Sequence, residues 1–133
     1  MSYSHIFFIL LFVSQLFNLF MHELSVVTSI LKTAEEEVKK ANGKFVSEIF
    51  LEIGKISGIE LSSLHFVWPQ CVADTVLQNA AITITSPDGK AKCLECDTLF
   101  KIEKLFDNCP NCNSPFKEIV SGKEMKIKKL IIN

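Results

Sequence analysis

The chain contains no arginine, and all 14 of its basic residues are lysines. Arginine is the side chain that most often reads guanine edges and grips phosphates through two parallel hydrogen bonds, so its absence counts against nucleic-acid recognition. The 14 lysines stand against 15 acidic residues, so no large net charge would attract a polyanion or a membrane surface. We therefore expect no nucleic-acid partner.

Residues 1–20 lack the features of an ordinary targeting segment. The apolar run from Ile6 to Phe20 is as long as a signal-peptide core and shorter than the roughly 20 residues of a membrane helix. No basic residue precedes it, and Asn18-Leu19-Phe20 has none of the small residues of a cleavage site. A signal peptide, a membrane segment and an upstream reading frame stay open. We favour the third, in which synthesis starts at Met21 and no membrane is contacted.

Four of the five cysteines form two Cys-x-x-Cys pairs, Cys93 with Cys96 and Cys109 with Cys112, separated by 12 residues. A gap of two residues lets both sulfurs of a pair turn toward one point, and four thiolates suit a tetrahedral zinc ion. Two disulfides are the alternative in an oxidising compartment. A dithiol redox pair would explain one motif but not its duplicate. We expect zinc, in a structural role because four sulfurs leave no position for water.

A zinc lobe at residues 89–119 would be too small to fold without help, because chains below about 40 residues usually need a metal or disulfides. Its charges are balanced between Lys90 and Asp107, which argues against nucleic acid there as well. The fifth cysteine, Cys71, lies among apolar residues and is expected to be a core thiol. An enzyme using it as nucleophile would need a histidine, and His65 is only a remote candidate.

Two segments have helical periodicity. Apolar residues recur every three or four positions from Leu24 to Ala41, and Asn42-Gly43 supplies a left-handed stop. A second stripe runs from Leu61 to Val76, with Ser62 or Ser63 as the expected N-cap. Pro69 should bend or shorten that second helix.

Three segments have the pattern of strands: 48–53, 82–85 and 124–132. The last cannot belong to the small zinc core, so we expect it to return and pair with the first two. The sequence therefore predicts an α+β fold: a small three-stranded sheet with two helices, at residues 21–88 and 120–133, and an inserted zinc-ribbon lobe at 89–119. No internal repeat is evident.

With Met21-His22-Glu23 opening the first helix, the chain resembles the HypA family of nickel metallochaperones, which help to mature nickel-iron hydrogenases and, in some organisms, urease. The resemblance covers residues 21–133. Its further motifs are Ile53-Gly54-Lys55-Ile56-Ser57, Ser62-Ser63-Leu64, the two Cys-x-x-Cys pairs and Ser121-Gly122-Lys123-Glu124-Met125-Lys126-Ile127.

The resemblance implies a Ni(II) site formed by the Met21 amine, the His22 imidazole and Glu23 beside it. Such donors suit the tetragonal geometry that Ni(II) favours. The printed sequence departs from the family here, because Phe20 precedes Met21 and makes its nitrogen an ordinary amide. The amine exists only if synthesis begins at Met21.

The resemblance also implies a cytoplasmic protein that is not an enzyme. Its partners would be the maturation GTPase, the hydrogenase large subunit and a second copy of itself. Some family members carry a histidine directly after a cysteine pair, whereas this chain has Asp97 and Asn113. The alternative from another class is a zinc-ribbon module that binds protein or nucleic acid without nickel.

Overall fold

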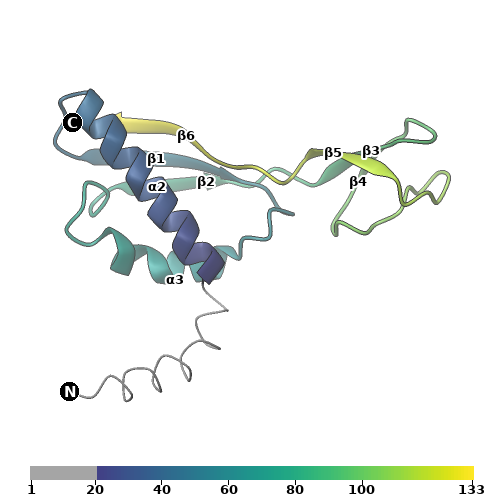
Figure 1. The fold of residues 1–133 in the computed structure, drawn as a ribbon, viewed down its shortest axis with the longest axis horizontal. Coiled ribbons are helices and arrows are strands. Elements are labelled where there is room, and N and C mark those ends of the chain that lie inside the picture. Colours follow the sequence, from purple (N-terminus) through teal and green to yellow (C-terminus); the bar gives the residue numbers. More distant parts are fainter. Residues whose placement is uncertain (1–20) are drawn as a thin grey trace, which may run out of the picture.

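The computed structural model describes residues 21–133, so the expected apolar extension at residues 1–20 lies outside the described residues. Within this part of the chain the elements form a larger and a smaller lobe, joined side by side (Figure 1). Neither helix of residues 21–133 combines the length and the hydropathy that a bilayer span needs. The elements in chain order are α2 (Met21–Lys40), β1 (Val46–Ile53), α3 (Leu61–Val72), β2 (Ala81–Thr85), β3 (Lys90–Cys93), β4 (Leu99–Lys101), β5 (Lys117–Ser121) and β6 (Met125–Ile132).

Strand β1 is the centre of the larger sheet, whose order is β2-β1-β6. It runs parallel to β2 and antiparallel to β6, with Ile49 opposite Ile82 on one side and Leu130 on the other. The predicted α+β fold is confirmed, but β6 pairs with β1 alone instead of with both earlier strands. The parallel crossover through α3 places β2 on one side of β1, so the other side is left for β6.

Helix α2 crosses one face of this sheet and supplies much of the core (Figure 1). Its buried apolar residues are Val26, Val27, Ile30, Ala34 and Val38, so its buried stripe includes Val26 and Ile30, which the predicted stripe did not. The helix begins at Met21, so Met21-His22-Glu23 opens it as expected, ahead of the apolar stripe that starts at Leu24. It ends at Lys40, and the left-handed stop follows as expected at Asn42, which has a φ of 52°.

Helix α3 is shorter than the predicted stripe, since it ends at Val72 instead of Val76. Pro69 lies in its last turn, where the missing backbone donor weakens the helix. The expected N-cap is also wrong: Ser62 and Ser63 lie inside the helix, and Glu60 is the N-cap residue without a side-chain capping bond.

The smaller lobe has a three-stranded sheet of order β4-β3-β5. Alternate residues of β3, Ala91 and Cys93, face a small core with Phe100 and Ile102. This core also contains Ile56, which comes from the loop after β1 in the larger lobe. The two lobes therefore share a buried side chain.

Three glycines lie where the chain passes between the lobes, namely Gly54, Gly89 and Gly122. A Cβ atom on Gly54 would lie 2.0 Å from the carbonyl oxygen of Gly122, and one on Gly122 would lie 2.6 Å from the Cα of Gly89. The Ile56 N–H donates to the Gly122 carbonyl at 2.9 Å. These contacts require backbone segments to approach more closely than any side chain allows.

Asp88 adds an ion pair at the same junction. Its carboxylate accepts a hydrogen bond from Lys55 and lies 4.0 Å from Lys101, so it links the loop after β1 to strand β4. The Lys55 hydrogen bond and the Lys101 charge lower the pKa of Asp88 below its ordinary value.

We expect Gly54→Ala to lower the free energy of unfolding by about 3 kcal/mol, because the new methyl group meets fixed backbone. Gly58→Ala is the matched control, since a Cβ there meets nothing within 4 Å and only its φ of 84° is unfavourable. Its expected cost is about 1 kcal/mol. Urea unfolding of both variants measures the difference, and equal losses would contradict the proposed close approach.

Candidate metal centres

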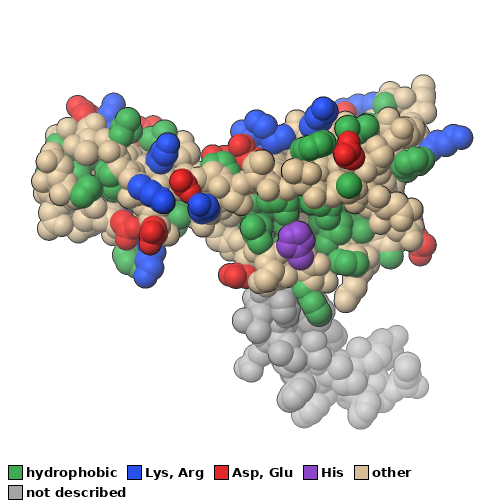
Figure 2. Space-filling view, turned by 180° about the vertical axis from the view of Figure 1, so that it is seen from behind, with side chains coloured by type: hydrophobic (Ala, Val, Ile, Leu, Met, Phe, Trp, Pro, Cys, Tyr) green, Lys and Arg blue, Asp and Glu red, His purple; other side chains and the backbone are tan. Residues whose placement is uncertain are grey.

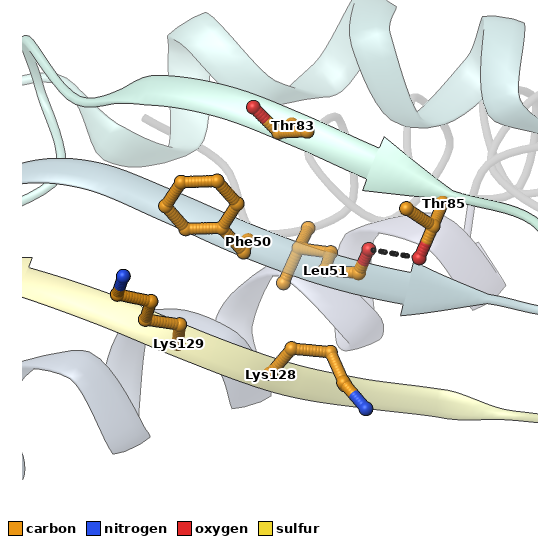
Figure 3. A pocket seen from close by; sticks show the side chains of 6 residues that line it. All are labelled: Phe50, Leu51, Thr83, Thr85, Lys128 and Lys129. Atoms are coloured by element: carbon orange, nitrogen blue, oxygen red, sulfur yellow. Dashed lines mark hydrogen bonds between the residues drawn. The ribbon is translucent and has the colours of Figure 1, made fainter.

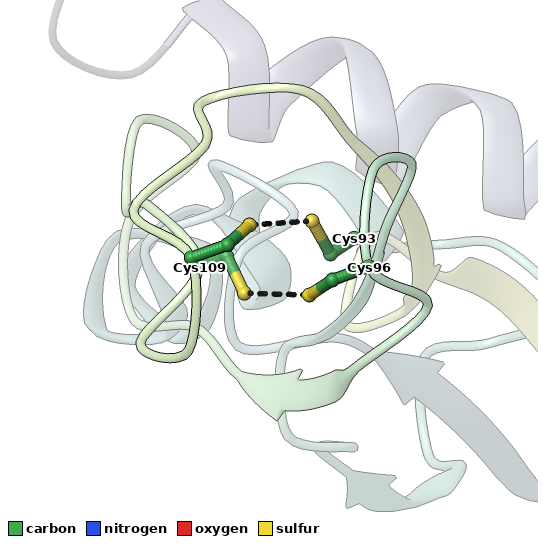
Figure 4. Close-up of side chains that lie close together, drawn as sticks. Cys93, Cys96 and Cys109 are labelled. Carbon is green, nitrogen blue, oxygen red and sulfur yellow. Dashed lines mark hydrogen bonds between the residues drawn. The ribbon is translucent and has the colours of Figure 1, made fainter.

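The four cysteines of the two Cys-x-x-Cys pairs converge in the smaller lobe. Their sulfur atoms all lie within 4.8 Å of one another. The Cys93 and Cys112 sulfurs are 3.5 Å apart, and those of Cys96 and Cys109 are 3.6 Å apart (Figure 4). A disulfide would require about 2.05 Å. A tetrahedral ion with metal–sulfur bonds of about 2.3 Å separates its ligands by about 3.8 Å, so the spacing fits one tetrahedral metal ion.

Two loops of the same geometry present these sulfurs, at residues 93–98 and 109–114. In each, the fifth residue donates its N–H to the carbonyl of the first cysteine, at 3.1 and 2.8 Å. The first cysteine in turn donates to the carbonyl of the sixth residue, at 2.9 and 3.0 Å. The fifth residues, Asp97 and Asn113, have φ angles of 61° and 62°. Asp and Asn tolerate this left-handed conformation better than most residues.

This internal repeat was not expected from the sequence. Its signal was present, because Cys-x-x-Cys is followed once by Asp-Thr and once by Asn-Ser. Each pair of residues consists of a short polar side chain and a hydroxyl. The repeat therefore explains why Asp97 and Asn113 stand directly after the cysteines: the turn needs a residue that accepts a positive φ.

The electrostatics of the cluster favour a cation. The Thr98 hydroxyl, 3.1 Å from the Cys96 sulfur, and the Asn111 amide lower the pKa of Cys96 to about 6. The Ser114 backbone N–H lowers the pKa of Cys112. The Cys93 sulfur and the loss of solvent raise it by more, so that the pKa is about 12. One sulfur thus ionises readily, while its neighbour keeps the proton that it shares in hydrogen bonds with the other sulfurs. A divalent ion would remove that conflict.

The start of α2 brings His22 and Glu23 into one helical turn, but their surroundings differ. His22 is exposed. Glu23 is only 3% exposed, and its Oε1 accepts the backbone N–H of Glu60 at 2.9 Å. This carboxylate lies at the N-terminus of α3, where negative charge is favourable. Glu23 therefore fastens the first turn of α2 to the first turn of α3.

Glu60 is the residue near this site that the sequence analysis missed. Its side chain is exposed, and it lies 37 positions from its hydrogen-bonding partner Glu23. No local pattern could reveal a contact at that separation. The two other candidate residues join neither site: Cys71 packs against the larger core as expected but is only partly buried, and His65 is exposed on α3.

The fold and the cysteine cluster define a small two-lobed metal-binding protein. Comparison with known families identifies the family within this class. The model described as "Hydrogenase/urease nickel incorporation, metallochaperone, hypA" matches residues 21–132, and the chain belongs to this family. The proteins it resembles are named hydrogenase maturation factor HypA. That of Parabacteroides distasonis is 36% identical over 112 residues, covering 84% of this chain and 97% of the relative. That of Francisella philomiragia is 34% identical over 113 residues, covering 85% and 100%.

Solved structures agree in fold. The solution structure of the Ni metallochaperone HypA from Helicobacter pylori is 25% identical, with a TM-score of 0.62 over 83% of this chain and 96% of that one. A second structure, described as the solution structure of HypA protein, is 26% identical, with a TM-score of 0.63 over 85% and 97%.

We expect the cysteine cluster to bind one divalent ion per chain. Cys96→Ser should weaken binding by more than about 100-fold, because a ligand is lost from a set of four. Cys71→Ser is the matched control and should leave the stoichiometry unchanged, since that thiol lies in the other lobe. Metal analysis after dialysis against a competing chelator measures both. Equal retention of metal by the two variants would contradict the assignment.

Proposed function

We propose that this protein binds Ni(II) at the start of α2 and delivers it to a nickel enzyme during that enzyme's maturation. The observation that carries the proposal is the family match over residues 21–132, whose first residues are Met21-His22-Glu23. The exposed position of His22 supports it, because a site that passes its metal on has to be accessible to the acceptor. The protein would carry metal and catalyse no reaction of its own.

The nickel ligands would be the Met21 amine, the His22 imidazole and Glu23. One oxygen of Glu23 already accepts the Glu60 N–H, so the other is the oxygen available to the metal. The same hydrogen bond holds the helix start in place and thereby fixes where His22 stands. With its imidazole exposed, this donor set would form a labile site, in which protons compete with nickel for the two nitrogens.

The Met21 amine requires that residues 1–20 are absent from the functional protein. We propose that synthesis begins at Met21, for which the poor match of residues 1–20 to any targeting segment is independent support. The protein would then act in the cytoplasm, with the maturation GTPase and the enzyme's nickel-accepting subunit as partners and with self-association as a further contact.

We assign zinc to the four cysteines. Sulfur ligands hold zinc tightly, and a complete set of four leaves no coordination position for a substrate. The two sites would thus have separate tasks: the sulfur site keeps its ion and stabilises the smaller lobe, while the nitrogen site exchanges its ion.

The smaller lobe also presents apolar side chains to solvent, which favours contact with another protein. Leu94, Leu99, Phe106 and Phe116 are 61%, 69%, 75% and 62% exposed. Clusters of exposed large apolar side chains often mark interaction sites. The second candidate function is therefore that of a zinc-ribbon module that binds another protein. This function is compatible with nickel delivery.

Removal of zinc should unfold residues 89–121 while the larger sheet persists. The lobe's core is small, and metal binding to such sites is worth on the order of 10–16 kcal/mol. Amide NMR spectra before and after chelation report each lobe separately. An unchanged spectrum for the smaller lobe would show that the metal is not what holds it together.

Nickel titration of protein that starts at Met21 should show one site per chain that His22→Ala weakens by at least about 100-fold, because the imidazole is lost. Glu23→Gln separates two roles of that residue. Glutamine retains an acceptor for the Glu60 N–H, so preserved affinity would mean that Glu23 positions the helix, and reduced affinity that it binds the metal.

The full chain of 133 residues is the control for the amine, since its Met21 nitrogen is an amide. It should bind nickel much more weakly than the chain starting at Met21. Equal affinities would rule out the amine as a ligand. Intact-mass measurement of protein from its native cell determines which form exists.

A further inference from the structure

The two cysteine loops repeat one backbone geometry, but their four sulfur atoms differ in exposure. Cys93 and Cys109, the first cysteine of each loop, are buried. Of the second cysteines, Cys96 is partly buried and Cys112 is exposed. An oxidant in solution therefore reaches the Cys112 sulfur more easily than the other three.

The hydrogen bonds to the two second cysteines differ in the same sense. The Cys96 sulfur lies 3.1 Å from the Thr98 hydroxyl and accepts the side-chain amide of Asn111 at 3.5 Å. Within residues 21–133 the Cys112 sulfur has no such side-chain donor, and its partners are the Ser114 backbone N–H and the other sulfurs. Because a hydrogen bond stabilises the electron pair on a sulfur, it makes a thiolate a weaker nucleophile. Cys112 is thus the more reactive of the two as well as the more exposed.

This difference follows from the residues at equivalent positions of the two loops. The third residue is Asn111 in one loop and Glu95 in the other, and an ionised carboxylate has no hydrogen to donate. The sixth residue is Thr98 in one loop and Ser114 in the other. The Thr98 hydroxyl contacts a sulfur, whereas the Ser114 hydroxyl accepts the Phe116 N–H at 3.2 Å. The repeat therefore holds for the backbone and not for the side chains around the sulfurs.

A second sulfur lies close to Cys112 in the other loop. The Cys93 and Cys112 sulfurs share a hydrogen bond at 3.5 Å, and Cys96 and Cys109 share one at 3.6 Å (Figure 4). The first distance exceeds the length of a disulfide bond by about 1.5 Å. A small movement of the exposed Cys112 loop would therefore allow a bond between the two loops.

The larger lobe offers no second pair of this kind within residues 21–133. Its one cysteine, Cys71, is partly buried against the larger core. The hollow on the larger sheet contains no sulfur atom and is lined by Phe50, Leu51, Thr83, Thr85, Lys128 and Lys129 (Figure 3). Cys71 is therefore a reference thiol inside the same molecule.

The charge of the smaller lobe does not select a charged oxidant. Lysine and acidic side chains lie next to each other on its surface (Figure 2), for example Lys92 and Asp97 at 3.9 Å. No field of one sign would attract or repel an ion there. Hydrogen peroxide, which is small and uncharged, needs no such field.

We propose that hydrogen peroxide opens the cysteine cluster at Cys112, and that Cys93 then forms a disulfide with it. This inference rests on the assignment of zinc to the four cysteines and adds a redox response to that site. The Cys112 thiolate attacks one peroxide oxygen, the O–O bond breaks, and the hydroxide that leaves takes a proton from water to become water. The product is a sulfenic acid on Cys112.

The second step forms the disulfide. The Cys93 thiolate attacks the sulfenic sulfur, the S–O bond breaks, and the hydroxide that leaves is protonated in turn. The two sulfurs have then lost two electrons, and one peroxide has become two waters. Two of the four ligands are consumed, so the lobe should release its ion. The disulfide joins the same two loops that the ion had joined, so oxidation should leave the lobe folded where chelation unfolds it.

Treatment of zinc-loaded protein with one equivalent of hydrogen peroxide tests the proposal. Free thiols are alkylated at intervals, peptide mass spectrometry identifies the disulfides, and a coloured indicator measures the released zinc. Cys93–Cys112 should form first and exceed any other pairing by about 5-fold or more at early times, with one zinc released per disulfide. Cys71 should still be alkylated, and the amide spectrum of residues 89–121 should remain that of a folded lobe.

Asn111→Ala removes a donor from the Cys96 sulfur, so the Cys96–Cys109 disulfide should increase by about 3-fold or more. Asn108→Ala is the matched control. It makes the same change in the same loop, but the Asn108 side chain donates to Asn113 and to no sulfur. It should leave the order of disulfides unchanged, and both variants should bind zinc.

A first disulfide between Cys96 and Cys109, or within one Cys-x-x-Cys pair, would overturn the proposal. So would oxidation of Cys71 while zinc is retained, or the same order of disulfides in the two asparagine variants. Failure of the zinc assignment is recognised separately, because protein that has met no peroxide would then lose its zinc on dialysis against a competing chelator.

Discussion

The rest of the structure depends on the two hydrogen-bonded ladders of β1. This strand has to hold β2 on one side and β6 on the other, although residues 86–124 separate those two strands in the chain. Closing so long a connection costs conformational entropy unless the connection has a structure of its own. The cysteine lobe supplies that structure. Its two ends meet at Gly89 and Gly122, where the backbones touch, and Ile56 from the larger lobe completes its core.

The cysteine cluster and the proposed nickel site follow from different physical arrangements. The sulfur cluster is formed by two loops with the same internal hydrogen bonds, which bring its four sulfurs together. At the start of α2, His22 is exposed, while the buried Glu23 accepts the Glu60 N–H and so fastens the helix to α3. Four sulfurs suit the retention of an ion, and an exposed imidazole suits its exchange. The loop of residues 54–60 joins them physically, since Ile56 lies in one core and Glu60 contacts the other site.

Much of the fold was predictable from local patterns. The helical stripe of α2, the alternation in β1 and the stop at Asn42 each depend on neighbours within a few residues. The four cysteines were equally clear, because the spacing of Cys-x-x-Cys by itself limits where two sulfurs can point. The early end of α3 and its capping were predicted less well. Pro69 indicated that α3 would be bent or shortened but not where it would end. At its start, Glu23 from α2 accepts the Glu60 N–H, whereas Ser62 and Ser63 lie inside the helix.

By itself, then, the sequence determined the two helices, the strands of the larger sheet and the pairing of cysteines in two Cys-x-x-Cys motifs, since these are set by residue type and short spacing. Only the tertiary structure decided that β1 is central, that Glu23 is buried against Glu60 and that three glycines meet between the lobes. Within residues 21–133 it also gave one edge strand of the larger sheet three lysines and the other, β2, no charged residue. These features join residues far apart in the chain, and only packing and backbone hydrogen bonding, which act across space, bring such residues together.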